Sequence, residues 1–409
     1  MSSVLEPLAP SQLQATGSGA LSRQPANAIP WKLAVPATLV CLPLLCWRIV
    51  LLRAAMPLED FMTYWASGRL FLTGSDPYSS TAMLAVERSL GWHAAQPLVM
   101  LNPPWVLPLV ALLGLMSFPA AHYAWLCISL AIEAISAVAL WRYFGGEKKH
   151  QWVALALVAT FLPAGAAEHL GQATPLMLAG LTAFLFALRH RRYFLGGVCL
   201  LTLGVKPHLL YLVLLAILLW AFQNKKWTLA LGAFLSYATA TLAAIAFNRN
   251  VPGYFHGTVR AAIDTSCGVG GVLRAAFGVQ HTWLQFLPTV IGTAWFVFYW
   301  TKNRRAWTWE AHLPLLLLVS ISSAPYFWAH DFIVAVPALI AFAVAISRTP
   351  ADWFMASAFY LVAQKAVFSQ AAVVSTAWMA TVSLLWLVFY VAGTSSLAAF
   401  RKPAIEPQP

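Results

Sequence analysis

The chain has 409 residues, of which 60% are hydrophobic and only 9% are charged, and its mean hydropathy is +0.72. So few charged side chains cannot coat a water-soluble protein of this length, and the repeated apolar runs predict an all-α polytopic membrane protein. The formal net charge is +12. The basic residues form short clusters between apolar runs, which is typical of cytoplasmic loops facing anionic lipid and argues against a nucleic-acid-binding protein.

The stretch 1–30 is rich in Ser, Ala, Pro and Gln and contains one basic residue, Arg23. Because no basic segment opens it, we predict a disordered cytoplasmic tail followed by an uncleaved membrane-spanning helix over about 33–54. Arg48 and Arg53 lie in the outer half of this helix. Either they extend to the lipid headgroups or they help to hold an anionic headgroup.

The next stretch, EDFMTYWASGRLFLTGSDPY, runs from Glu59 to Tyr78 and carries acidic residues among aromatic ones. Apolar side chains recur in it at three-and-four spacing, and Gly74 and Pro77 end the pattern, which predicts an amphipathic helix just outside the membrane. The residues on its shared face are Phe61, Tyr64, Trp65, Gly68 and Leu72. Asp60, at the start of this helix, either caps it or performs chemistry.

Residues 103–118, PPWVLPLVALLGLMSF, are apolar but short for a membrane crossing. If they crossed, every later basic cluster would face outward, against the positive-inside rule. We therefore predict a second interfacial helix here, within a first outer loop over about 55–120. The basic clusters that then face the cytoplasm are Lys148-Lys149, Arg189 to Arg192, Lys225-Lys226 and Lys302 to Arg305.

The remaining apolar runs predict a transmembrane domain over 31–396 with about 12 helices in all and both termini in the cytoplasm. The further spans are about 121–143, 152–166, 173–188, 194–205, 208–222, 228–247, 284–300, 311–325, 332–347, 353–369 and 373–393. A second long outer loop is expected at 248–283 and a cytoplasmic tail at 397–409. Several spans are shorter than the roughly 20 residues of a full crossing, which indicates helices broken near the outer face.

On this topology the unusual polar residues collect at the outer edge of the membrane domain, where we therefore expect a functional site. They are Asp60, Arg69, Asp76, Asn102, Glu168, His169, Gln172, Lys206, His208, Arg260, Asp264, Arg274, His330 and Asp331.

Each of these residues has a structural alternative. Lys206 either binds a phosphate from its tight hairpin or extends to the headgroups, and Arg274 either binds a donor or keeps its loop soluble. His330 beside Asp331 is either functional or an ordinary interfacial histidine. Five further residues could simply stabilise turns in the chain: Glu168, His169, Gln172, Asp76 and Tyr78. Glu133, near the middle of a span, is expected to pair with an arginine or a hydroxyl inside the bundle.

Several familiar cofactor signatures are missing from the sequence in their required context. We find no Walker loop, dinucleotide-binding glycine run, HExxH or GxSxG motif. The five cysteines have no metal-ligand spacing, and the first outer loop has no DxD pair. We therefore expect neither a metal nor another cofactor.

The ordered set of stretches resembles glycosyltransferase family 87. The resemblance rests on EDFMTYWASGRLFLTGSDPY, NPPWVLPLVALLGLMSFP, the turn His169 to Gln172, the Lys206-Pro207 hairpin and PYFWAHDF, and it covers roughly 55–345. The chain departs from the family at 264–275, DTSCGVGGVLRA, where members often carry Asn-Gln-Ser before the arginine.

The resemblance implies a GT-C membrane fold and transfer of a sugar, with mannose favoured, from a polyprenyl-phosphate donor to a lipid or glycan hydroxyl. It implies that Asp60 is the catalytic base, that Lys206 contacts the donor phosphate and that His330 lies near the reaction. Tyr64 and Gln172 would contact the sugar. The expected substrate-binding residues, from the resemblance and the outer-edge pattern together, are Tyr64, Arg69, His169, Gln172, Lys206, His208, Arg274 and Asp331.

The expected setting is the bacterial inner membrane, with the active site on the periplasmic side. Because the lipid phosphate of the donor is a good leaving group, a single inverting displacement needs only one base to deprotonate the acceptor. Hydrolysis usually needs paired carboxylates. Two alternatives remain: a transporter or flippase for a lipid-linked or anionic substrate, to which broken helices and buried charge are also suited, and an inactive homologue that serves as an assembly partner.

Overall fold

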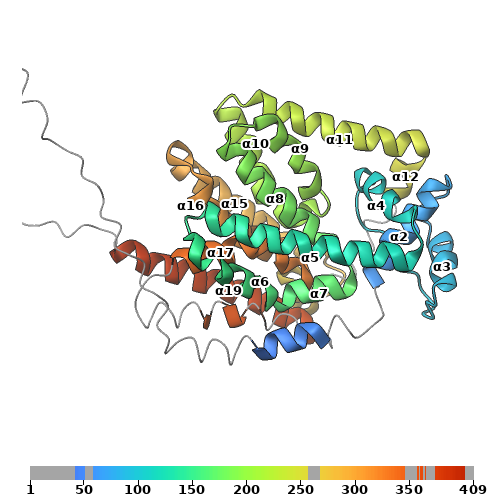
Figure 1. Cartoon of the computed structure of the whole chain (residues 1–409), viewed down its shortest axis with the longest axis horizontal. Helices are drawn as coiled ribbons and strands as arrows, with labels where there is room; N and C mark the ends of the chain where they lie inside the picture. The colour runs from blue at the N-terminus through green and yellow to red at the C-terminus, as the bar shows by residue number, and fades with distance from the viewer. Residues whose placement is uncertain are drawn as a thin grey trace, which may run out of the picture. The chain divides into compact units, whose positions relative to one another are not determined.

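Figure 1 shows the computed structural model, which describes residues 42–50, 59–256, 268–345, 357–358, 360–362, 364 and 374–400. The chain divides into two units, Met1–Leu39 and Val40–Pro409, and all described residues belong to the second. These residues form helices and turns without a strand, which confirms the all-α class. The predicted tail 1–30 and the residues Arg53, Arg260 and Asp264 lie outside the described residues.

The bundle is built from helices, and those between Phe118 and Phe247 are joined by short turns. In chain order they are α5 (Phe118–Tyr143), α6 (Gln151–Ala159), α7 (Leu162–Leu170), α8 (Thr174–Arg189), α9 (Tyr193–Leu203), η3 (Pro207–Leu210), α10 (Tyr211–Gln223), α11 (Trp227–Phe247), α15 (Leu287–Asn303), α16 (Trp309–Ser322), η6 (Ala329–Ala335), α17 (Val336–Ala345) and α19 (Val374–Phe400).

Length and hydropathy support a membrane protein. Among the described residues, Phe118–Tyr143 and Trp227–Phe247 are long and apolar enough to cross a membrane, and a third span results if the bent pair α6–α7 counts as one. Further apolar helices of 10–17 residues accompany them. The number of about 12 transmembrane helices and the predicted domain limits stay predictions.

The segment predicted as the first outer loop contains both predicted helices, α2 (Glu59–Leu72) and α4 (Leu107–Gly114). They cross closely because Gly68 faces the backbone of Val110 and Gly114 faces the backbone of Gly68, where a Cβ atom would collide. Both helices pack at the start of α5. The crossing therefore ties this segment to the start of α5.

A third helix in this loop, α3 (Ser80–Ser89), was not predicted. Its N-cap is Ser79, whose hydroxyl accepts a hydrogen bond from the Ala82 N–H at 3.4 Å. Met83 is fully buried against Ala66 and Leu70 of α2. This second apolar face of α2 explains why a segment that is only half apolar becomes helical. The predicted second outer loop also contains short helices, α12 (Val251–His256) and α14 (Val269–Phe277).

The span predicted over 152–166 is a broken one, because α6 and α7 meet at a bend of 56°. Pro163 lies in the first turn of α7, where it can begin a helix but cannot continue the hydrogen bonds of the preceding one. The break agrees with the general expectation of interrupted helices.

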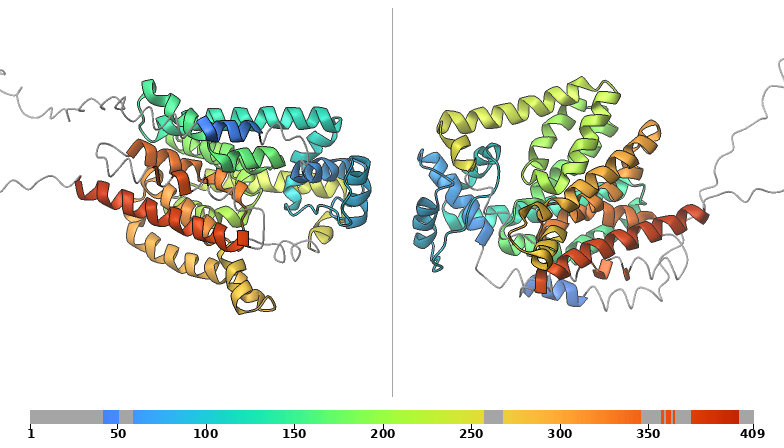
Figure 2. Two further views of the ribbon diagram at one scale, coloured as in Figure 1. Left: turned by 90° about the horizontal axis from the view of Figure 1, so that it is seen from below. Right: turned by 180° about the vertical axis from the view of Figure 1, so that it is seen from behind.

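The packed helices have different kinds of residues at their two ends. α9 packs against both α8 and α11, and α16 packs against α10, α17 and α19, with α19 in red in Figure 2. α8 begins two residues after Gln172 and ends at Arg189, and α9 starts at Tyr193 and ends three residues before Lys206. The predicted outer turns and the basic cluster of Arg189 to Arg192 therefore lie at opposite ends of the same helices.

Candidate active site

The first polar group is formed by Asp60 and Tyr64 of α2 with Gln172, in the turn between α7 and α8. The Gln172 side-chain amide donates to Asp60 Oδ2 at 2.5 Å, and the Tyr64 hydroxyl donates to Gln172 Oε1 at 3.2 Å. Gln172 and Tyr64 are buried, whereas Asp60 is half-buried. One amide therefore orients the Asp60 carboxylate and leaves its other oxygen, Oδ1, for a further partner.

The position of Gln172 is set by the end of α7. Gly171 adopts a left-handed conformation with φ of 68°, which glycine tolerates best, and a Cβ atom there would collide with Phe61. The Gln172 N–H donates to Ala167 O at 2.7 Å, and the Trp125 indole donates to Gly171 O at 3.0 Å. The turn is thus held by α2, α5 and α7 together.

The second polar group is a buried ion pair beside a histidine. Lys206 Nζ donates to Asp331 Oδ1 at 2.8 Å and lies 3.4 Å from His330 Nε2. The other Asp331 oxygen accepts the Trp328 N–H at 2.9 Å. Lys206 lies 5.7 Å from the centre of the Trp328 ring, which stacks on His330. Because Asp331 is fully buried, its charge is balanced locally by Lys206.

The backbone just before Lys206 is held by two residues of the NPPW stretch. Asn102 donates to Val205 O at 2.9 Å, and the Trp105 indole donates to Gly204 O at 2.9 Å. Asn102 was expected at the outer edge of the membrane domain, but this supporting contact was not predicted from the sequence. The available signal was the polar Asn102 directly before a proline pair.

Two histidine nitrogens in this region have no hydrogen-bond partner among the described residues: Nδ1 of His330 and Nε2 of His208. His208 packs on Tyr326 with ring centres 3.9 Å apart. A buried nitrogen without a hydrogen bond costs folding free energy. These two nitrogens are therefore candidates for hydrogen bonds to a substrate. The carboxylates also act electrostatically between the two polar groups, Asp60 on His330 and Asp331 on Tyr64. We therefore treat the two groups as one candidate site.

Three predicted binding residues are not shown to join this cluster. Arg69 is exposed and donates to Gly114 O at 3.1 Å, at the α2–α4 crossing. Arg274 donates to Val279 O at 2.9 Å and to Gln285 Oε1 at 3.3 Å, and so closes its own loop. His169 is half-buried at the end of α7. Substrate binding by these three stays a prediction, and two of them have structural roles that the sequence did not reveal.

Asp76 and Tyr78 form a turn, as predicted. Asp76 Oδ1 accepts the Tyr78 N–H at 2.8 Å, which is the local side-chain contact typical of aspartate in turns. Burial raises the pKa of Asp76, and the N–H groups of Tyr78 and Ser79 oppose that rise.

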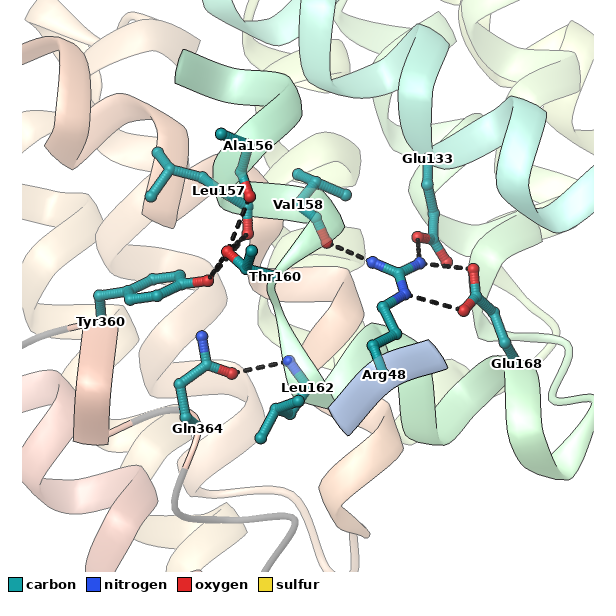
Figure 3. Close-up of polar contacts among 10 residues, drawn as sticks. All are labelled: Arg48, Glu133, Ala156, Leu157, Val158, Thr160, Leu162, Glu168, Tyr360 and Gln364. Carbon is teal, nitrogen blue, oxygen red and sulfur yellow. Dashed lines mark hydrogen bonds and ion pairs between the residues drawn. The ribbon is translucent and has the colours of Figure 1, made fainter. Parts of the chain in front are cut away.

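Arg48 is buried, so both interpretations of it as a headgroup residue are wrong. Its guanidinium pairs with Glu133 of α5 at 2.5 Å and with Glu168 of α7 at 2.5 Å (Figure 3). The expectation that Glu133 pairs with an arginine is thereby confirmed. Glu168 belongs to this ion cluster, whereas it had been considered part of the outer turn. We call Arg48, Glu133 and Glu168 the buried triad.

The buried triad leads to a stability prediction. Replacing Arg48 by glutamine leaves Glu168 buried without its cation, and we expect the free energy of unfolding to fall by about 3–5 kcal/mol. Glu133→Gln should cost much less, because Arg48 and Glu168 remain paired. Thermal unfolding of the two variants in detergent measures the difference, and equal destabilisation would contradict the assignment.

Among the described residues, no group of three or more His, Cys, Asp or Glu side chains could hold a metal ion. That the protein needs neither a metal nor another cofactor stays a prediction.

The model of glycosyltransferase family 87 matches residues 100–324, more than half of the chain. The chain belongs to glycosyltransferase family 87. Membership indicates a membrane glycosyltransferase, which uses a sugar donor and an acceptor. The matched segment contains Gln172 and Lys206, and the fold brings two residues from outside it to them, Asp60 to Gln172 and His330 to Lys206. No curated protein and no solved structure matches the chain.

Proposed function

We propose that this family 87 glycosyltransferase transfers a sugar, with mannose favoured, from a polyprenyl-phosphate donor to a hydroxyl of a lipid or glycan acceptor. The observation that carries the proposal is that the site contains both an oriented carboxylate, Asp60, and a buried lysine, Lys206. A base and a phosphate-binding cation are the two elements that this reaction needs.

In this mechanism Asp60 removes the proton from the acceptor hydroxyl as that oxygen attacks the anomeric carbon. The bond from that carbon to the phosphate oxygen breaks, and the lipid phosphate leaves with the bonding electrons. Lys206 and the unpaired nitrogens of His208 and His330 stabilise the negative charge that develops on the phosphate. A single displacement inverts the anomeric configuration.

The distribution of charge supports an active site on the outer, periplasmic side of a bacterial inner membrane with both termini in the cytoplasm. The site residues lie at one end of α8 and α9, and the basic cluster of Arg189 to Arg192 lies at the other. By the positive-inside rule the basic end faces the cytoplasm. A donor carried on a lipid suits the opposite face, since it brings its phosphate to the membrane surface.

Transfer of radiolabelled sugar tests the proposal. Membranes containing the protein, and matched membranes without it, are supplied with polyprenyl-phosphate mannose, arabinose or glucose, or with nucleotide sugars. We expect transfer from a lipid donor only in membranes with the protein. Transfer from nucleotide sugars alone would overturn the proposal. Movement of the intact lipid-linked sugar across proteoliposomes without transfer would favour the transporter alternative.

A further inference from the structure

The break between α6 and α7 leaves backbone groups that no helix satisfies, and distant side chains bind them. Arg48 donates to Val158 O at 2.5 Å, and Tyr360 donates to Leu157 O at 3.1 Å. The Leu162 N–H donates to Gln364 Oε1 at 2.6 Å. Figure 3 shows these three contacts around the bend. Non-helical backbone is tolerated in an apolar environment only when such groups are bonded.

Arg48 differs from the other two side chains because it holds both sides of the bend. It binds Val158 O at the end of α6, and it binds the Glu168 carboxylate of α7 through Nε at 3.0 Å and Nη2 at 2.5 Å. A planar guanidinium that makes a two-point contact restricts orientation as well as distance. Arg48 therefore sets the angle between α6 and α7.

Glu168 of α7 is connected to Asp60 through the turn that contains Gln172. The Gly171 N–H donates to Glu168 O at 3.0 Å, and the next residue is Gln172, whose side chain orients the Asp60 carboxylate. A change in the direction of α7 would move Gln172 with it. A misplacement of about 1 Å far from the chemistry can lower a rate by about 10²-fold.

We propose that Arg48 is a positioning residue for Asp60, acting through α7 and Gln172. This inference rests on the proposed function of Asp60 as the base. Glu133 has a secondary role. Its Oε2 accepts a hydrogen bond from Arg48 Nη2 at 2.5 Å, so Arg48 faces two carboxylates in the buried triad.

The charge balance determines which variants are informative. Arg48→Gln alone leaves an uncompensated carboxylate and can fail to fold. The double variant Arg48→Gln/Glu168→Gln removes one positive and one negative charge together and leaves Glu133 as the one carboxyl of the triad, which burial favours in its neutral form. Glu133→Gln and Tyr360→Phe are matched controls, since the first leaves the Arg48–Glu168 contact in place and the second removes a contact on the α6 side of the bend.

Kinetics of sugar transfer test the proposal. We expect the double variant to fold and to lower kcat by about 10–100-fold, with little change in the donor KM because Lys206 and His330 are untouched. The controls should retain most of the wild-type kcat. If Arg48 acts through Gln172, adding the double variant to Gln172→Ala should cause little further loss. Losses that multiply fully in the Gln172→Ala background, or parallel changes in kcat and KM, would overturn the proposal.

A measurement without activity separates this inference from the proposed function. Leu170→Cys, in a background whose native cysteines are replaced, places a thiol at the end of α7. We expect the double variant at Arg48 and Glu168 to speed its reaction with a water-soluble maleimide, and Tyr360→Phe to have little effect. An unchanged labelling rate in the double variant would overturn the positioning role. If the wild type transfers no sugar from any donor, the proposed function fails whatever the labelling shows.

Discussion

Replacing Asp60 by asparagine is expected to lower kcat for sugar transfer by about 10²–10⁴-fold, the usual contribution of a general base. Asparagine is close in shape to aspartate and its carbonyl oxygen can still accept the hydrogen bond from Gln172, but it cannot take a proton from the acceptor. The donor KM should change little, because the contacts of Lys206 with Asp331 and His330 are unaffected. Initial rates at saturating donor and acceptor measure the effect.

Asp76→Asn is the matched control for this prediction. It makes the same chemical change sixteen positions later, in a turn where Asp76 binds the Tyr78 N–H, and it should leave transfer near the wild-type rate. Equal transfer by wild type and a well-folded Asp60→Asn variant would remove Asp60 from catalysis. Asp331 would then be the next carboxylate to test, because it lies beside Lys206 and His330, whereas Glu168 belongs to the buried triad.

The second large effect is expected at Lys206. Lys206→Met leaves the fully buried Asp331 without its cation, and we expect the free energy of unfolding to fall by about 3–5 kcal/mol. Loss of transfer in this variant would therefore not distinguish phosphate binding from stability. Thermal unfolding in detergent measures the stability term.

The double variant Lys206→Met/Asp331→Asn separates the two effects. It removes both charges of the pair, so we expect most of the lost stability to return. Transfer from a polyprenyl-phosphate donor should stay reduced by about 10–100-fold in kcat/KM, the value of one charged hydrogen bond to the phosphate. Recovery of both stability and transfer would show that Lys206 serves only to neutralise Asp331, and would contradict a phosphate contact.

The first outer loop shows which parts of the fold were predictable and which were not. α2 was predicted from a local pattern, its apolar spacing, and α4 from a short apolar run together with the distribution of basic clusters along the chain. α3 was missed because its helical state depends on burial of Met83 against α2, a contact outside the reach of a local pattern. The bend between α6 and α7 was likewise placed only by the structure, with side chains from residues 48, 360 and 364 binding its backbone.

The candidate site likewise has a part that the sequence predicted and a part that it could not predict. Asp60, Gln172, Lys206, His330 and Asp331 were selected because polar residues in an apolar chain are costly and need a function or a partner. The sequence could not show that Gln172 orients Asp60, or that Lys206 pairs with Asp331, since 112 and 125 positions separate these partners. The sequence also assigned substrate binding to both Arg69 and Lys206, although Arg69 bridges α2 and α4.

The sequence by itself determined the membrane class, the helical fold and the family, because composition, apolar length and the order of the motifs are properties of the chain alone. Only the tertiary structure decided the partner of each buried charge. Arg48 is the clearest case: the same arginine near the end of an apolar run can reach the headgroups or pair inside the bundle. The choice depends on Glu133 and Glu168, which α5 and α7 bring within 2.5 Å of it. A buried charge is stable only where the fold supplies its counter-charge, and that requirement is met by packing between segments distant in the chain.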